Sequence, residues 1–561
     1  MRASQAQDLR LSLAEVACRV LSRWQRYWFA DGGRLAAAMV RMGIAAAVLL
    51  TLLRLATLST VNLPGPPELY RPVGIWMLLG HTVPPGWLID ALWVIAWTGS
   101  AAMLLGLYTR AATAVSCGGA LALVSLSFAS SATWSHQYNV VFLAQIAFLG
   151  ARGGDALSLD ALVRRWRRQP AVDVPRGYQW SLRLVQLAVA LMFAGAAFHK
   201  IMHGHFTLRW ALSDNLRHQL LVRYDLAGLP RPVLTSWLID DAWRFRTAAV
   251  LNLISQAMPI VACIFVRRPL IRALAGGFFL LETVAFSFII NLWNPHWIPL
   301  AAVFVDWDRL IAFVRRRPLV IPAPPAGWRP RRAARIFVVG FVVYDVITAL
   351  IPTIDQRINT YPFSAFPMFA TIRARAPYDQ HQPYAVAGDR FEALSDRPLD
   401  QAAQRWLDHT NRRLEAVRDP ERLRNKLAVI LAELQRRYPQ FGVHGVRHYL
   451  AIFEAPAYPA PARFEPHLIG MTGEIDRSGA FHTVLGTIDS TGVTLRPVGL
   501  DTSGAQLSYY RDDVLAPQPI TSQRTGDRFL TGPLDGDPIY VVATIGSDRW
   551  LVASRRAWRW E

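Results

Sequence analysis

The sequence predicts a mainly α-helical, polytopic membrane bundle of about nine transmembrane helices, followed by a soluble α+β domain. Hydrophobic residues make up 52% of the 561 residues and charged residues only 18%. Apolar runs close to the length of about 20 residues that a spanning helix needs dominate the chain up to about residue 355. After that point the pattern changes to amphipathic helices, alternating strands and turns. The average composition therefore combines two different parts.

The segment 1–34 is predicted to be a cytoplasmic amphipathic helix on the membrane surface. It has arginines throughout and no uninterrupted apolar stretch of a secretory signal. Its apolar residues recur at helical spacing beside these arginines, as in helices that lie in the interface. They are Leu9, Leu13, Val16, Val20, Trp24 and Trp28.

The segment 35–355 is predicted to form the transmembrane domain. We expect nine spans, of which the fourth and the eighth are the shortest. They lie near 35–56, 87–107, 111–130, 137–151, 180–201, 247–266, 270–291, 296–314 and 334–353.

Arginine counts predict the orientation of these spans. The five loops on the side of the N-terminus carry 23 arginines, and the four loops on the other side carry 7. Positive residues favour cytoplasmic loops. The sequence therefore predicts the inner membrane of a bacterium, with a cytoplasmic N-terminus and an extracytoplasmic C-terminal domain.

The extracytoplasmic part is predicted to begin with an interfacial linker, 356–398, which contains an aromatic and proline-rich run at 361–369. An α+β domain is expected over 399–561. Two amphipathic helices, 399–414 and 423–438, should come first. Strands are expected at 446–453, 482–488, 493–498, 539–545 and 549–554, the last two forming a hairpin around 546–548.

The net charge of +20 does not indicate nucleic-acid binding, because the arginines cluster in short loops between apolar segments. The three cysteines, Cys18, Cys117 and Cys263, all lie in the membrane part. No disulfide framework or paired-cysteine metal site is therefore possible in the C-terminal domain.

Lys200 is the residue that most favours a reactive site. It is one of only two lysines and lies near the predicted outer end of the fifth span, after the small residues 194–197. Ionisable groups inside membrane helices are costly and usually functional, and a buried amine is a plausible base. A lysine that extends toward the interface is the alternative interpretation.

Seven histidines, all in predicted outer loops or at outer ends of spans, support a polar site on that side. They are His81, His136, His199, His203, His205, His218 and His296. Three of them, at 199, 203 and 205, could approach a metal, but no fourth ligand is specified, and we predict no metal site. Two intramembrane acids, Glu282 and Asp345, are expected to pair with Arg41, Arg54 or Arg183; a pocket wall or a proton path is the alternative interpretation.

Two stretches resemble the horizontally transferred transmembrane (HTTM) domain family, which includes vitamin K-dependent gamma-carboxylase. The first is Trp134-Ser135-His136-Gln137-Tyr138, a span, and then Leu157-Ser158-Leu159-Asp160-Ala161-Leu162. The second is the helix end Phe193-Ala194-Gly195-Ala196-Ala197-Phe198-His199-Lys200-Ile201. The resemblance covers roughly residues 35–315.

The resemblance implies a carboxylase- or oxygenase-like site in which Lys200 is the base that deprotonates a reduced quinone such as vitamin K. It also implies that His136 takes part in the chemistry, with His199 in the place of the family's second lysine. The Trp that usually follows the lysine is not at the family's spacing, and Trp210 comes later. No likeness extends to the C-terminal domain.

Three functions remain open. The first is a membrane enzyme that acts on a lipid-soluble, quinone-like substrate, with Lys200 and His136 lining one cavity. The second is a non-catalytic scaffold that presents the C-terminal domain to protein partners, which the sequence does not identify. The third is a transporter, although the sequence has no related halves or paired interrupted helices. Membrane lipid is a partner in each case.

Overall fold

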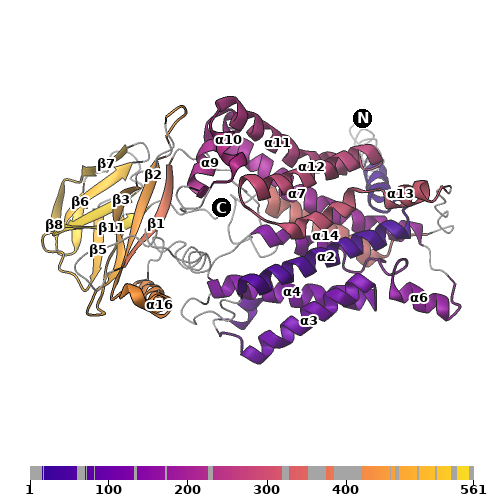
Figure 1. Cartoon of the computed structure of the whole chain (residues 1–561), viewed down its shortest axis with the longest axis horizontal. Coiled ribbons are helices and arrows are strands. Elements are labelled where there is room, and N and C mark those ends of the chain that lie inside the picture. The colour runs from indigo at the N-terminus through magenta and orange to yellow at the C-terminus, as the bar shows by residue number, and fades with distance from the viewer. Residues whose placement is uncertain are drawn as a thin grey trace, which may run out of the picture.

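The fold was analysed in a computed structural model of the chain (Figure 1). The structure describes residues 16, 18–59, 70, 72–80, 82–131, 136–170, 174–224, 231–316, 318, 328–350, 375–383, 419–454, 456–460, 466–488, 492–511, 514–531 and 540–554. His81, the aromatic run 361–369 and the predicted helix 399–414 lie outside these residues, as do Leu9 and Leu13 of the N-terminal helix.

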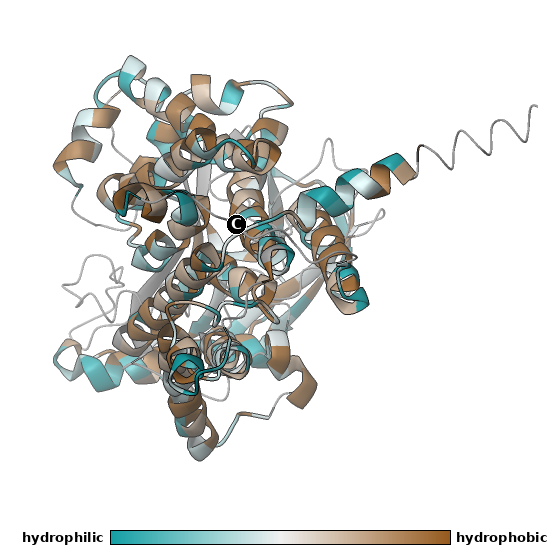
Figure 2. Cartoon of the chain, turned by 90° about the vertical axis from the view of Figure 1, so that its right-hand side faces the viewer, coloured by the Kyte–Doolittle hydropathy of each residue, from teal (hydrophilic) through white to brown (hydrophobic). Residues whose placement is uncertain are grey.

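Six of the described helices are long and apolar enough to cross a membrane. They are α2 (Arg34–Ser59), α3 (Gly86–Leu105), α4 (Thr109–Ser131), α7 (Gln179–His203), α11 (Ala242–Ile264) and α12 (Pro269–Ile289). Large apolar side chains such as Leu281 and Phe288 stand exposed on the outside of the bundle. The bundle is accordingly dominated by hydrophobic residues when it is seen end-on (Figure 2). Such a surface suits lipid rather than water.

The predicted count of nine spans is not confirmed. The fourth predicted span is the short helix α5 (Asn139–Ala147), preceded by η3 (His136–Tyr138), and nine residues do not cross a bilayer. The eighth is divided into the 3-10 helix η5 (Pro295–Phe304) and α13 (Trp307–Val314). Pro299, inside this segment, lacks a backbone donor, which disfavours a regular α-helix there. The ninth corresponds to α14 (Arg332–Leu350), which carries two arginines and Asp345.

The helix α7 is the central element of the bundle. It packs against α5, α11 and α14, and 83% of its apolar stretch is buried, against 28% for α3. Its small residues Gly195, Ala196 and Ala197 are buried and let neighbouring helices approach closely. Phe193 meets Phe279 of α12 and Trp297 of η5 edge-on.

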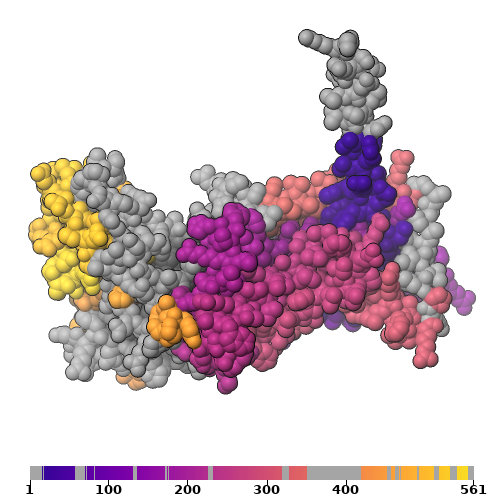
Figure 3. All heavy atoms as spheres, turned by 90° about the horizontal axis from the view of Figure 1, so that it is seen from above, coloured from indigo at the N-terminus to yellow at the C-terminus, as the bar shows by residue number. Residues whose placement is uncertain are grey.

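The bundle has two distinct ends, which we call the α6 end and the sheet end (Figure 1). The α6 end carries α6 (Leu159–Trp166) and α13, and the helical residues 18–28 project sideways from it (Figure 3). The sheet end carries α8 (Arg209–Leu212), α9 (Asn215–Tyr224) and α10 (Val233–Ile239). The remaining short helices are η2 (Gly74–Leu79) and η4 (Pro175–Gly177).

The C-terminal domain is an 11-stranded, mainly antiparallel sheet with strand order β7-β6-β10-β11-β3-β4-β5-β9-β8, and β1 and β2 branch from β3. Among the described strands, only β11 and β3 pair in parallel. The strands are β1 (Arg375–Pro383), β2 (Val446–Glu454), β3 (Pro466–Ile475), β4 (Phe481–Ile488), β5 (Gly492–Val498), β6 (Gln506–Arg511), β7 (Val514–Pro519), β8 (Ser522–Thr525), β9 (Arg528–Thr531), β10 (Tyr540–Ile545) and β11 (Asp548–Ser554).

The local patterns of the C-terminal domain correspond well to these elements. The five predicted strands coincide with β2, β4, β5, β10 and β11. The last two form a hairpin in which Gly546 adopts φ +60, a conformation that favours glycine. The second predicted helix is α16 (Pro420–Arg437), which buries Leu427 and Ile430 on the sheet before η9 (Pro439–Phe441). The sheet also takes β1 from the range 356–398 that was predicted to be a linker.

Candidate functional site

The Lys200 side chain is enclosed at the sheet end of α7. It is in the last turn of the helix and only 1% exposed. Its Nζ donates hydrogen bonds to Asn252 Oδ1 (2.5 Å) and to Gln256 Oε1 (2.9 Å). Both acceptors belong to α11, and they lie four residues apart, so they occupy one face of that helix.

The two amides connect Lys200 to a buried carboxylate. Glu282 of α12 is 3% exposed, and its Oε1 accepts hydrogen bonds from Asn252 Nδ2 (2.5 Å) and Gln256 Nε2 (2.9 Å). Each amide therefore accepts from the amine and donates to the acid. We call these four residues the lysine–glutamate bridge.

The indole of Trp210 covers the remaining side of the amine. Lys200 Nζ lies 4.3 Å from the centre of the Trp210 ring, a distance that permits a cation–π contact. The same indole packs with Ala249 and Leu253 of α11 in a small apolar cluster. The family resemblance left Trp210 at an unmatched spacing, yet the fold places it directly over the lysine.

This arrangement can hold a proton in more than one place. A buried ion pair is stable only if its remaining polar atoms are satisfied, and the amides of Asn252 and Gln256 satisfy both ends. Because lysine can exist as a neutral amine and glutamate as a neutral acid, the bridge can also be uncharged, with one proton on the Glu282 carboxyl group instead of Nζ. The bridge can therefore accept a proton from a neighbouring group.

The two predicted histidines do not bond to Lys200. His199 is buried, and its Nε2 lies 3.3 Å from the carbonyl oxygen of Ala349, so it faces α14 instead of α11. His136 is half-buried in η3, where Gln137 O accepts from His296 Nε2 (3.0 Å) and Trp297 Nε1 (2.7 Å). The shared cavity of Lys200 and His136 stays a prediction.

The predicted pairing of Glu282 with an arginine is wrong. Glu282 takes its hydrogen bonds from amides, and the three candidate arginines have other partners. Arg41 donates to backbone carbonyls, Arg54 donates to Asn294 Oδ1 (3.3 Å), and the guanidinium of Arg183 lies 4.7 Å from the ring centre of Tyr27. Asp345 is buried, and its Oδ2 has no hydrogen-bond partner among the described residues.

Sequence reasoning missed Asn252 and Gln256 as partners of Lys200. The available signal was their spacing. Two carboxamides four residues apart in an apolar helix share a face, and an acid lies in the following span. Nothing local in the sequence indicated that this face would meet the end of α7.

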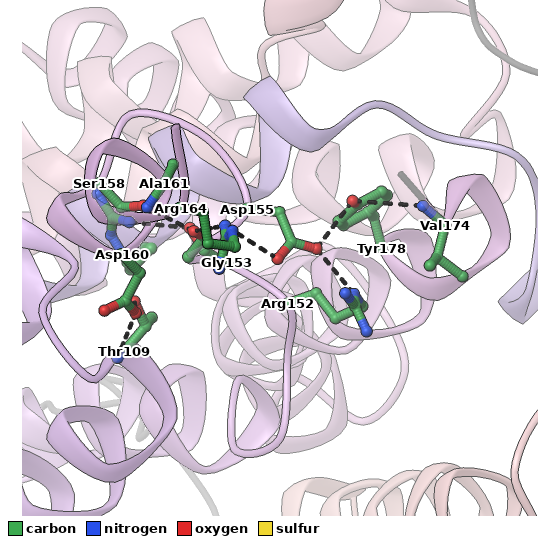
Figure 4. A network of polar contacts seen from close by, with 12 residues as sticks. Thr109, Arg152, Gly153, Asp155, Ser158, Asp160, Ala161, Arg164, Val174 and Tyr178 are labelled. Carbon is green, nitrogen blue, oxygen red and sulfur yellow. Dashed lines mark hydrogen bonds and ion pairs between the residues drawn. The ribbon is translucent and has the colours of Figure 1, made fainter. Parts of the chain in front are cut away.

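A second, partly buried polar network lies at the α6 end (Figure 4). Asp155 accepts from Arg152 Nε (2.7 Å) and Tyr178 Oη (2.9 Å), and it pairs with Arg164. Asp160 accepts from the backbone N–H groups of Tyr108 (2.8 Å) and Thr109 (2.9 Å) and so caps the start of α4. We call this set the aspartate network.

The aspartate network accounts for the Leu157–Leu162 stretch on structural grounds. Ser158 Oγ accepts from Ala161 N (3.0 Å) and caps α6. Burial raises the pKa of Asp160, but the hydrogen bonds from Thr109 and Tyr108 outweigh it and hold the pKa below its usual value. Arg41, fully buried, donates to the carbonyls of Gly153 (2.9 Å) and Leu157 (2.6 Å).

Comparison with known proteins adds no relative. No protein-family model, curated protein or solved structure matches this chain. Within the described part of the chain, no group of three or more histidine, cysteine, aspartate or glutamate side chains is arranged to hold a metal ion. The lysine–glutamate bridge is therefore the arrangement on which a functional argument rests.

Proposed function

We propose that this chain is a membrane enzyme in which Lys200 acts as a base on a lipid-soluble, quinone-like substrate. The observation that supports the proposal is the bridge from Lys200 through two amides to Glu282, enclosed in a helix bundle with a lipid-facing surface. A purely structural cation could have used arginine, the basic residue at nearly every other position.

The proposed step is a single proton transfer. In the uncharged bridge Lys200 is a free amine and Glu282 holds the proton. The O–H bond of a bound hydroquinone breaks, an N–H bond forms on Nζ, and the substrate keeps the electron pair as an anion. Asn252 and Gln256 hold the resulting ammonium in place. Because Trp210 covers Nζ, the indole must move before the substrate oxygen reaches the amine.

The orientation is part of the same proposal. We infer that the α6 end faces the cytoplasm and the sheet end lies outside. In support, α6 and α13 both combine arginines with exposed apolar residues, among them Trp166 (82% exposed) and Phe313 (81%). Such helices bind the headgroup region of a leaflet with anionic lipids. Fused after residue 380, a reporter that works only outside the cytoplasm should be active, and a reporter that works only in the cytoplasm should be inactive. Activity of the cytoplasmic reporter would show that the proposed orientation is reversed.

Mass spectrometry of co-purified lipids tests the enzyme proposal. We expect the wild-type protein to retain a quinone-like lipid that Lys200→Ala loses. The matched control is Lys426→Arg, since Lys426 is the only other lysine and lies in the C-terminal domain. Lys200→Arg should fold and insert but have no activity on a reduced short-chain naphthoquinone. The same lipids in wild type and Lys200→Ala, together with full function of Lys200→Arg, would overturn the proposal.

A non-catalytic scaffold is the second candidate, and one observation favours it. The hydrogen bonds of Lys200 are made within the protein, and the amine is enclosed as in a structural contact. The scaffold predicts that bridge variants change stability alone. A Lys200→Met variant that keeps the lipid content of the wild type and melts at a lower temperature would favour it.

A further inference from the structure

The loop after β2 is fastened to the bundle close to the lysine–glutamate bridge. We call residues 456–460 the docking loop; Figure 1 shows the turn after β2 beside α9 and α10. Arg217 of α9 donates from Nη1 to the carbonyl of Pro456 and from Nη2 to that of Ala460 (2.8 Å). One guanidinium thus holds both ends of the loop.

A second group holds the middle of the docking loop. Asp214 Oδ2 accepts from the backbone N–H of Tyr458 (2.9 Å), and its Oδ1 accepts from Arg246 of α11 (3.0 Å). Burial raises the pKa of Asp214, but these hydrogen bonds outweigh it and keep the pKa below its usual value. The ring of Tyr458 lies 6.0 Å from that of buried Phe245.

The residues that hold the loop are close in the chain to residues that surround the amine. Trp210, which covers Lys200, lies four residues before Asp214. Phe245 and Asn252 lie seven residues apart on α11, about two helical turns, so they share a face. The apolar cluster that contains Trp210, Ala249 and Leu253 also packs against Leu216, which lies between Asp214 and Arg217 in the chain.

We propose that the docking loop is a strap that keeps Trp210 over Lys200, and that its release opens the amine to a ligand. Asp214 and Arg217 are then positioning residues, which act through α8, α9 and α11. The strap rests on the proposed function only for its biological purpose. Its effect on access to Lys200 can be measured without any substrate.

The test uses the fact that the chain contains only two lysines. The full-length protein in nanodiscs is treated with acetic anhydride, and peptide mass spectrometry gives the ratio of Lys200 acetylation in each variant to that in the wild type. We expect Arg217→Ala and Tyr458→Ala each to raise this ratio about tenfold, the change that corresponds to 1.4 kcal/mol of lost closing free energy. Arg209→Ala is the matched control, because Arg209 is exposed on α8 and is not in contact with the loop.

Each outcome decides the proposal. An unchanged ratio in a folded Arg217→Ala or Tyr458→Ala variant overturns the strap, as does an equal rise in Arg209→Ala. If Arg217→Ala does not fold, Tyr458→Ala decides, because it leaves both charged groups in place. A raised ratio in protein whose lipid content does not depend on Lys200 would support the strap and contradict the proposed enzyme.

Discussion

The bundle has a polar network at each end, and the two networks hold charge differently. In the aspartate network, arginine side chains bond to backbone carbonyls and carboxylates, and Asp160 also caps the start of α4. In the lysine–glutamate bridge, one amine and one acid are separated by two neutral amides. Arginine cannot readily lose its proton, whereas lysine can. The first network is therefore fixed in charge, and the second is not.

The largest effect is expected when Arg41, which donates to backbone carbonyls beside the aspartate network, is removed. Arg41→Ala leaves two backbone carbonyls without their hydrogen-bond donor and creates a buried cavity. We therefore expect the free energy of unfolding to fall by about 3–5 kcal/mol. Thermal melting in nanodiscs measures it. Arg110→Ala, at an exposed position on the same end, is the control and should melt close to the wild type. Equal melting temperatures of Arg41→Ala and Arg110→Ala would show that the hydrogen bonds of Arg41 do not stabilise this end of the bundle.

A smaller loss is expected at the bridge, because its charges can neutralise each other. Glu282→Gln removes the acid but keeps a group of the same shape, and the amine can respond by losing its proton. We expect about 1.5–3 kcal/mol, the range for a hydrogen bond to a charged group. The double variant Lys200→Met/Glu282→Gln should cost less than the sum of the two single variants. If the two losses in unfolding free energy were strictly additive, Lys200 and Glu282 would not be energetically coupled.

The capping contact of Asp160 can be removed without touching any arginine. Asp160→Ala should cost about 1–2 kcal/mol, as for loss of a helix cap, and hydrogen exchange should increase at the first turn of α4. Asp160→Asn keeps an acceptor and should recover most of the loss. If both variants exchange equally fast, the charge of Asp160 matters more than its hydrogen bonds.

The smallest effect is expected in the sheet, where His482 and Asp476 form a partly exposed ion pair outside the bundle. His482 Nε2 lies 2.9 Å from Asp476 Oδ2, and Nδ1 lies 2.8 Å from Gly499 O. Burial of the histidine lowers its pKa, but these two contacts outweigh burial and raise the pKa above 6.5. Burial raises the pKa of Asp476, but the hydrogen bonds that Asp476 accepts outweigh burial and lower the pKa to about 2. The stabilisation from His482 is therefore complete below pH 6.5 and is lost as the pH rises through its folded pKa. The Asp476 contribution is present above pH 3.8 and is lost as the pH falls toward 2.

We expect the His482 contribution to be roughly 0.5–1 kcal/mol, because solvent screens the pair. Melting of the wild type at pH 6 and pH 8, compared with His482→Gln, measures it. In His482→Gln, the part of the difference in melting temperature between pH 6 and pH 8 that comes from the ion pair should disappear. A pH dependence that is unchanged in His482→Gln would assign it to other groups, such as Glu474.

Local patterns predicted the local features well. Apolar length identified six membrane helices, and alternation with turn residues identified five strands and the hairpin at Gly546. The prediction of a span at 296–314 used apolar length alone. It failed because proline inside η5 interrupts an α-helix in a segment whose composition still resembles a span. Lys200 could be chosen from its rarity. Its partners Asn252 and Gln256 could not, because they meet the amine only through the packing of α11 on α7.

The position of β11 in the sheet has a consequence for the order of assembly. This strand, 548–554, lies between β10 and β3, so it joins the half of the sheet that contains β6 and β7 to the half that contains β2 and β3. During synthesis the helices and the first strands leave the ribosome long before this joining strand. The docking loop, which follows β2, is therefore present before the sheet that supports it is complete. Until residue 554 has been made, the bundle holds a loop whose own domain is still in two parts.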